Sequence, residues 1–158
     1  MKKLIYAAAL TLLLTSTIPA AQATGVPGDV KASHIDHTGA HPFNARSPNA
    51  THHFELHVEG PSLSQLSIDV PEGIRIGRKI EITDRAQKKV EATVSIQDRK
   101  AKIVFAKPVP SGTTLSISMK GIRTSSYLGR TWLYRVSSQM VGLIGDIPLG
   151  TAQIRTYD

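Results

Sequence analysis

The sequence predicts an all-β protein: a single antiparallel β-sandwich of the immunoglobulin-like kind with about eight short strands, or, as second choice, a small β-barrel. Three observations support this prediction. From residue 52 onward, apolar and polar residues alternate with the period of two that strands require. The alternating runs are short and are separated by turns rich in Gly, Pro, Asp and Ser. The 158 residues include no cysteine, so an apolar core must hold the fold together without disulfides.

Residues 1–23 have the pattern of a cleaved secretory signal peptide. Two lysines precede a 15-residue apolar run over 4–18, and an Ala-x-Ala exit ends at Ala23. A membrane-spanning helix needs about 20 apolar residues, more than this run provides. We therefore expect export, no stable membrane span after cleavage, and a periplasmic or extracellular product.

The rest of the chain divides into a lead-in and one domain. Residues 24–50 show neither helical nor strand period and are punctuated by Gly and Pro, which predicts a flexible N-terminal segment that contributes at most one edge strand. Residues 51–158 are expected to form the single sandwich domain, since their length suits one modest core.

Each expected strand turns one face to the core and one to water, as antiparallel sheets do. In chain order, the inward-facing residues of the expected strands are Phe54, Leu56 and Val58; Leu66, Ile68 and Val70; Ile80 and Ile82; Val90, Ala92, Val94 and Ile96; Ile103 and Phe105; Leu115, Ile117 and Met119; and Trp132, Tyr134 and Val136. A final strand is expected within 152–157. A short helix around Ser137–Ile144 is the only helical stretch that the pattern allows, and its two glycines weaken it.

Several of these runs, taken in their order, resemble a cyanobacterial family of exported proteins known only as domain of unknown function 2808. The runs that carry the resemblance are Phe54–Val58, Leu66–Gly73, Ile80–Asp84, Val104–Leu115, Gly121–Arg123, Gly129–Tyr134 and Ile147–Ile154. They are spread over about two-thirds of the chain. The resemblance implies an exported envelope protein, and it brings no activity, ligand or catalytic residue with it.

All six histidines lie between positions 34 and 57, and imidazole is the commonest metal ligand among side chains. On a strand, His53, Glu55 and His57 share one face, and residues two positions apart lie about 7 Å from each other. We predict them as candidate metal ligands for Cu, Zn or Ni, completed by His34, His37 or His41 if the lead-in folds back. His52 is expected to point inward beside Phe54. The alternative is that the cluster is ordinary solvated surface.

The middle of the chain is basic. Residues 75–102 hold nine Lys and Arg side chains, within a formal net charge of +7. Such a surface suits an anionic partner in the envelope, namely a protein, a glycan or an anionic surface. Nucleic acid is not expected, because no aromatic platform for bases accompanies the charge and the chain is exported. Solvated strand faces and turns are the plainer interpretation.

Trp132 and Tyr134 could form an exposed aromatic anchor for a partner or fill the core, and the sequence favours the core. No Gly-x-Ser-x-Gly elbow, cysteine nucleophile or phosphate-binding glycine loop is present, so we assign no catalytic residue and expect no enzyme. The sequence therefore predicts a non-enzymatic exported envelope module, either binding or structural. A periplasmic metal-binding protein is the alternative, and an uncharacterised hydrolase is the least favoured.

Overall fold

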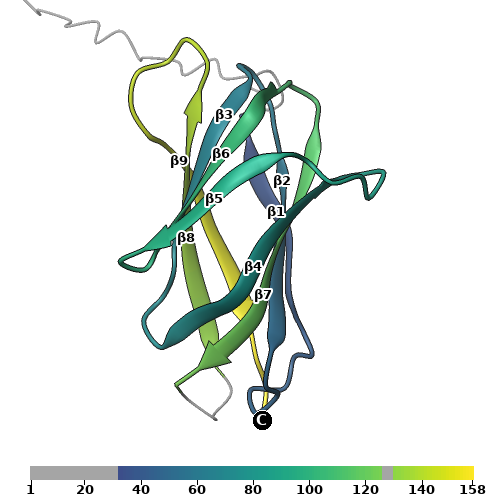
Figure 1. Cartoon of the computed structure of the whole chain (residues 1–158), viewed down its shortest axis with the longest axis vertical. Helices are drawn as coiled ribbons and strands as arrows, with labels where there is room; N and C mark the ends of the chain where they lie inside the picture. The colour runs from purple at the N-terminus through teal and green to yellow at the C-terminus, as the bar shows by residue number, and fades with distance from the viewer. Residues whose placement is uncertain (1–31, 126–129) are drawn as a thin grey trace, which may run out of the picture.

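The computed structural model describes residues 32–125 and 130–158, and these form nine strands in two packed sheets (Figure 1). The signal-peptide prediction concerns residues that lie outside these ranges. The strands are β1 (His34–His41), β2 (Ala50–His57), β3 (Leu63–Asp69), β4 (Ile74–Asp84), β5 (Ala92–Gln97), β6 (Lys100–Val109), β7 (Thr114–Thr124), β8 (Thr131–Met140) and β9 (Ile147–Arg155). Within the described ranges, no helix is long and apolar enough to cross a membrane.

The two sheets confirm the predicted antiparallel sandwich. One sheet has the strand order β1-β2-β7-β4, and the other has the order β5-β6-β3-β8-β9. Every pair of neighbouring strands in both sheets is antiparallel. The strand that raises the number from the expected eight to nine is β1, which lies inside the 24–50 lead-in and is the edge strand that the sequence allowed.

The core lies between the sheets and consists largely of the residues that the alternation turned inward. The expectation was wrong for the run over 90–96: Ile96 is 42% exposed, and Val90, Ala92 and Val94 are only half-buried, because β5 is the terminal strand of its sheet. Phe54, Leu66, Ile103, Leu115 and Tyr134 are among the fully buried members of the core. Burying one such side chain stabilises the fold by about 1.5–3 kcal/mol, and this core serves a chain that has no disulfide. Alternation along the strands therefore accounts for most of the interior.

Two expectations at β8 have different outcomes. Trp132 is a core residue, as favoured: it is buried, and its indole Nε1–H donates a 3.1 Å hydrogen bond to Thr156 Oγ1. The helix predicted around Ser137–Ile144 is wrong. Strand β8 runs on to Met140, and the chain then turns at Gly142, whose φ of 82° is left-handed and incompatible with a right-handed helix.

The edge strand β1 contains a β-bulge. Asp36 pairs with Glu55 and Gly39 pairs with His53, so two residues of β1, His37 and Thr38, stand opposite one residue of β2. His37 has a left-handed φ of 42°. On the other side of the bulge, Thr38 Oγ1 donates a 2.6 Å hydrogen bond to the carbonyl of Gln153 in β9. Strand β1 therefore contacts the edges of both sheets.

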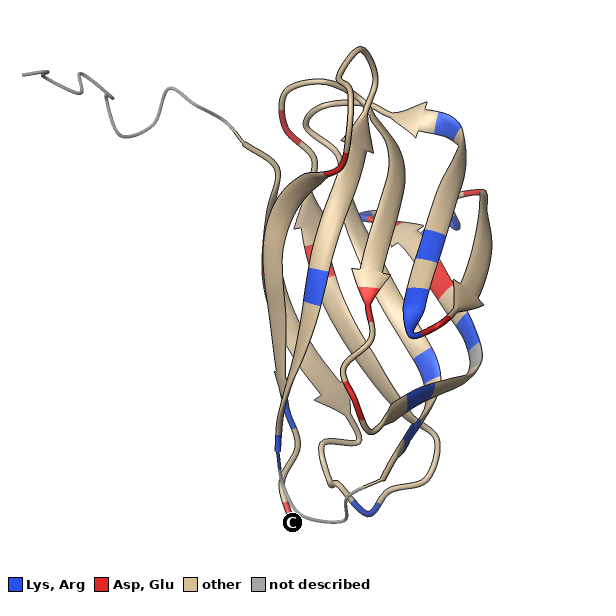
Figure 2. Ribbon diagram, turned by 90° about the vertical axis from the view of Figure 1, so that its left-hand side faces the viewer, with Lys and Arg blue, Asp and Glu red and all other residues tan. Residues whose placement is uncertain are grey.

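Charge is unevenly distributed over the sandwich. Figure 2 shows Lys and Arg concentrated on one half of the ribbon, with acidic residues interspersed among them. This distribution follows from the sequence, because the basic residues of 75–102 all lie in β4, in β6 and in the two turns on either side of β5. The histidines lie elsewhere, on β1 and β2.

Candidate metal centre

Strand β2 alternates strictly between buried and half-buried residues, and its histidines lie on both faces. His52 faces the core together with Phe54, as predicted, whereas His53, Glu55 and His57 face outward. The three residues proposed from the sequence as metal ligands therefore share one face of one strand. Their side chains nevertheless have different surroundings.

The inward-facing His52 is fully buried and makes a 2.6 Å hydrogen bond through Nδ1 with the Tyr134 hydroxyl. Its other ring nitrogen, Nε2, has no hydrogen-bond partner. Burial, and secondarily the neighbouring His53, lower the pKa of His52 from 6.5 to about 4. Burial also raises the pKa of the Tyr134 hydroxyl, so both groups are uncharged near neutral pH. This pair belongs to the core and is closed to an ion from solvent.

The bulge in β1 brings two further polar side chains to the outer face of β2. The Asp36 carboxylate accepts a 2.8 Å hydrogen bond from the backbone N–H of His37, which fixes its orientation. The imidazole Nδ1 of His37 lies 3.3 Å from one carboxylate oxygen of Asp36 and 3.3 Å from one of Glu55. His37 is thus placed between two carboxylates, one from each strand of the hairpin.

His57 completes a group of potential ligands with these two residues. One ligand atom each from Asp36, His37 and His57 lies within 4.8 Å of the other two. Asp36 and His37 are exposed and His57 is half-buried, so an ion in solution has access to all three. Because ligands bonded at about 2.1 Å in a tetrahedral site lie about 3.4 Å apart, a bound ion would draw these atoms together by up to about 1.4 Å.

His57 is held in place by two neighbours. Its Nδ1 shares a 3.1 Å hydrogen bond with the Thr114 hydroxyl of β7. Its ring stacks on the ring of His34, with 4.9 Å between centroids and 13° between planes. A histidine that binds a metal through one nitrogen normally has its other nitrogen hydrogen-bonded, which fixes the ring. Thr114 leaves Nε2 of His57 as the nitrogen that can bind an ion.

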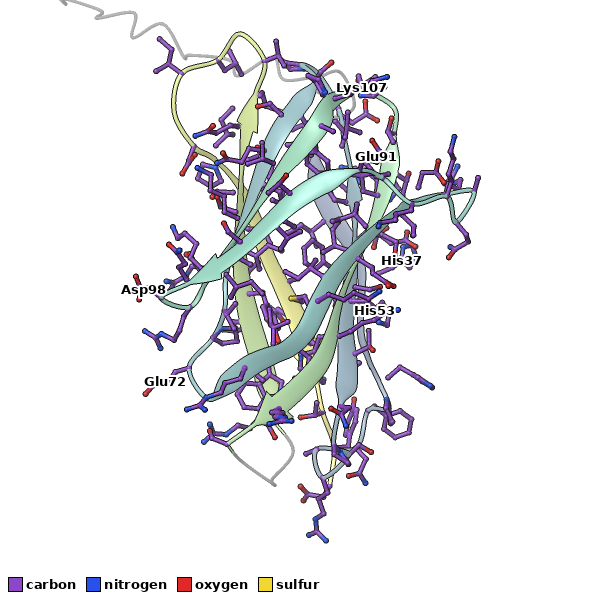
Figure 3. The ribbon with its side chains drawn as sticks, in the orientation of Figure 1. His37, His53, Glu72, Glu91, Asp98 and Lys107 are labelled. Atoms are coloured by element: carbon purple, nitrogen blue, oxygen red, sulfur yellow. The ribbon has the colours of Figure 1, made fainter. Side chains whose placement is uncertain are left out.

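The remaining residues named from the sequence lie around this group. Glu55 touches it through His37. The His53 ring lies instead over Gly39 of β1: a Cβ added to that glycine would be 2.9 Å from His53 Cε1. His41 pairs with Thr51, farther along the hairpin. Figure 3 shows the labelled His37 and His53 on the same flank of the sandwich.

Asp36 is the member of the group that the sequence did not indicate. An exposed aspartate beside a histidine is unremarkable in a polar segment, and the bulge that turns both residues toward β2 depends on the left-handed backbone at His37. The neighbouring histidine was the one available signal. Two imidazoles and one or two carboxylates resemble the mixed nitrogen–oxygen donor sets that proteins use for divalent transition metals.

The fold and this outer face define a small antiparallel β-sandwich domain that carries a cluster of histidines and carboxylates on its first hairpin. The chain belongs to the family described as "Protein of unknown function (DUF2808)", whose sequence profile matches residues 35–151. The resemblance drawn from the sequence is thus confirmed for the family. No curated protein matches the chain significantly.

Solved structures with a similar arrangement share very little sequence with this chain. The collagen-binding domain of a Staphylococcus aureus adhesin is 8% identical, with a TM-score of 0.48, and the match covers 80% of this chain and 97% of that one. ACE19, the collagen-binding subdomain of the Enterococcus faecalis surface protein ACE, is 8% identical, with a TM-score of 0.49 and coverage of 82% and 99%. The bacterial hydrophobin BslA is 11% identical, with a TM-score of 0.47 and coverage of 81% and 94%.

Proposed function

We propose that this protein is an exported, non-enzymatic module that binds a divalent transition metal ion on the outer face of its first hairpin. The observation that carries the proposal is the convergence of Asp36, His37 and His57, whose ligand atoms lie within 4.8 Å of one another. Two strands supply these residues, and the hairpin register and the bulge bring them together. Glu55, 3.3 Å from His37, is close enough to add a further oxygen ligand.

The donor set points to the class of metal. Imidazole nitrogen suits Cu²⁺, Ni²⁺ and Zn²⁺, whereas Ca²⁺ and Mg²⁺ prefer sites made of oxygen alone. For a given site of this kind, affinity rises from Ni²⁺ to Cu²⁺ and falls again to Zn²⁺. We therefore expect Cu²⁺ to bind most tightly. The group offers no thiolate, which suits an oxidising compartment.

The proposed setting is the bacterial cell envelope. It is supported by the signal-like pattern of residues 1–23. The family resemblance found in the sequence also implied an exported envelope protein of cyanobacterial origin. In that setting the metal-bearing hairpin would serve a binding or structural role toward another envelope component, and no chemical step is assigned to the chain.

Calorimetric titration tests the metal site directly. Metal-stripped, untagged protein comprising residues 24–158 is titrated with Cu²⁺, Ni²⁺ and Zn²⁺, because a purification tag would add its own histidines. We expect one ion per chain, bound more tightly than about 1 μM. His37→Ala and His57→Ala should each weaken binding by at least about tenfold.

The matched control is His41→Ala, which removes an exposed histidine from the same hairpin but outside the converging group. It should bind the metal as the wild type does. An equal loss in all three variants would mean that the histidines act as a diffuse chelating surface. Unchanged binding in His37→Ala and His57→Ala would reduce His37 to an ordinary ion-pair partner of Asp36 and Glu55.

A further inference from the structure

Two pairs of like charges face each other across β4 and β7, and they differ in how they are neutralised. Lys79 is paired with Lys120, and Arg75 is paired with Arg123. Like charges directly opposite each other on neighbouring antiparallel strands are destabilising. A protein keeps such a pair at a cost unless a counter-charge compensates it.

The lysine pair has its counter-charge within the fold. The two carboxylate oxygens of Glu81 form ion pairs with Lys79 and Lys120, one oxygen to each. Hydrogen bonds from Lys120 and Lys79 lower the pKa of Glu81 to about 2, so this carboxylate stays charged over the whole physiological range. The lysine pair is therefore an internally compensated surface feature.

The arginine pair has no such partner. Within residues 32–125 and 130–158, no carboxylate lies within ion-pair distance of Arg75 or Arg123. Arg99, in the turn between β5 and β6, is likewise without an ion pair there, and all three side chains are exposed. Their positive charge is left for an external anion.

All three arginines line one hollow of about 680 Å³, where the end of β7 meets the turn before β4. The backbone N–H of Val70 donates a 2.7 Å hydrogen bond to the carbonyl of Arg99, which fastens the β5–β6 turn beside this hollow. Asp98 and Arg99 both have left-handed φ angles, 47° and 61°, as a two-residue hairpin turn requires. Arginines from both sheets are thereby brought to one place.

Two glycines allow β4 and β7 to approach each other closely beside Arg123. Gly121 has a φ of 69°, and the alternation of β7 slips there, so that Ile122 is buried and Arg123 faces outward. A Cβ at Gly77 would lie 2.7 Å from the Gly121 carbonyl, so only a glycine allows this close crossing of β4 and β7. The Arg123 Nε lies 3.9 Å from that same position, above Gly77.

We propose that this hollow binds the sulfate, phosphate or carboxylate group of an acidic polysaccharide. The planar guanidinium fork matches two oxygens of such a group, and three forks from three segments favour an oxyanion over a lone halide. Glu72 also lines the hollow and reduces its charge without cancelling it. Ser125 adds a hydroxyl that suits the hydroxyls of a sugar.

A membrane headgroup shares this chemistry, but the position of the exposed apolar residues favours the polysaccharide. Val141, Leu143 and Ile144 are exposed on the β8–β9 loop, at the upper end of the molecule in Figure 1. The hollow lies toward the other end, beside Glu72, which is labelled in Figure 3. Leu133, which is also exposed, lines a neighbouring hollow with Glu72 and Arg99, so a bilayer that met the arginines would find single apolar side chains there and not the three of the β8–β9 loop.

The test uses dextran sulfate and heparin as acidic polysaccharides, with uncharged dextran, inorganic sulfate and anionic phospholipid vesicles as comparison probes. The variant Arg75→Gln/Arg123→Gln is compared with Lys79→Gln/Lys120→Gln. Each variant removes two positive charges, one from β4 and one from β7. We expect the arginine variant to bind the sulfated polymers at least about tenfold more weakly. The lysine variant should lose less than about threefold.

Thermal unfolding of both variants controls for folding. The arginine variant should be no less stable than the wild type, because it removes a like-charge pair. Equal loss of polymer binding in the two variants would overturn the proposal in favour of net charge alone. Binding to vesicles or to inorganic sulfate without binding to the sulfated polymers would overturn it as well.

Discussion

The two faces of β2 carry the same kind of side chain in opposite environments. His52, on the inner face, is sealed in the core with one hydrogen bond and one unpartnered nitrogen. His57, on the outer face, is half-buried between His34 and Thr114, beside a cluster that is open to solvent. Burial lowers the pKa of the inner histidine and keeps it neutral near neutral pH, whereas the outer one is accessible to an ion from solvent.

The histidine cluster in the sequence is therefore not one functional unit. Only the outer histidines are placed to bind a ligand, and the inner one acts on stability. Variants of the two faces should therefore separate stability from metal affinity. The expected effects are largest on the inner face.

Acid should destabilise the fold through the inner histidine, and this is the largest effect that we expect. His52 titrates near 6.5 in the unfolded chain but only near 4 in the folded one. Between these two pKa values, His52 is protonated in the unfolded chain and neutral in the folded chain. The free energy of unfolding therefore decreases as the pH falls. We expect a loss of about 3 kcal/mol between about pH 7 and pH 4, measured by urea denaturation at several pH values.

His52→Gln should flatten this pH dependence, because glutamine does not titrate, and His41→Gln should keep it. The contribution is fully present above pH 6.5 and is lost toward pH 4. If His52→Gln and the wild type lost stability in parallel, another group would be responsible for the acid sensitivity.

Removing the inner hydroxyl should have the next largest effect. Tyr134→Phe takes away the hydrogen-bond partner of His52 and leaves both ring nitrogens of a buried imidazole unsatisfied. We expect the free energy of unfolding to fall by about 2 kcal/mol, measured by urea denaturation near neutral pH. Metal affinity should not change, since the outer face is untouched. A loss of metal binding with intact stability would show that the two faces are coupled.

Removing the matching hydroxyl on the outer face should affect the ligand and spare the fold. Thr114→Val keeps the shape of the side chain but removes the hydrogen bond to His57 Nδ1. We expect a stability change within about 0.5 kcal/mol and a metal affinity about tenfold lower, near 1.4 kcal/mol. Calorimetry and urea denaturation on the same preparation measure both quantities. Unchanged affinity would remove Thr114 from the site.

The strands of this fold follow from alternation, because burial on one face selects apolar residues at every second position. That rule placed Phe54 and His52 inward and His53 and His57 outward, as the structure has them. It failed over 137–144, where apolar and polar residues do not alternate regularly. A helix was predicted there, but the segment is the end of β8 followed by a turn at Gly142.

The arrangement of the candidate site depends on features that residue types do not announce. The bulge at His37 and the slip at Gly121 each shift which face a side chain occupies. The first brings Asp36 and His37 to His57, and the second turns Arg123 outward. A left-handed histidine has no sequence signature, so Asp36 could not be found from spacing alone. The slip at Gly121 is equally invisible in the spacing, so the arginine hollow could not be found either.

The hydrogen bond from Thr38 to Gln153 has a consequence for how copies of this chain meet. Strands β1 and β9 are the terminal strands of their sheets, and an open terminal strand invites pairing with another molecule. Here the two ends lie against each other, and the irregular backbone at His37 interrupts the regular ladder that an incoming strand would need. A foreign strand could join this seam only after the two sheets had separated, so this edge of the sandwich is protected against strand addition from another molecule.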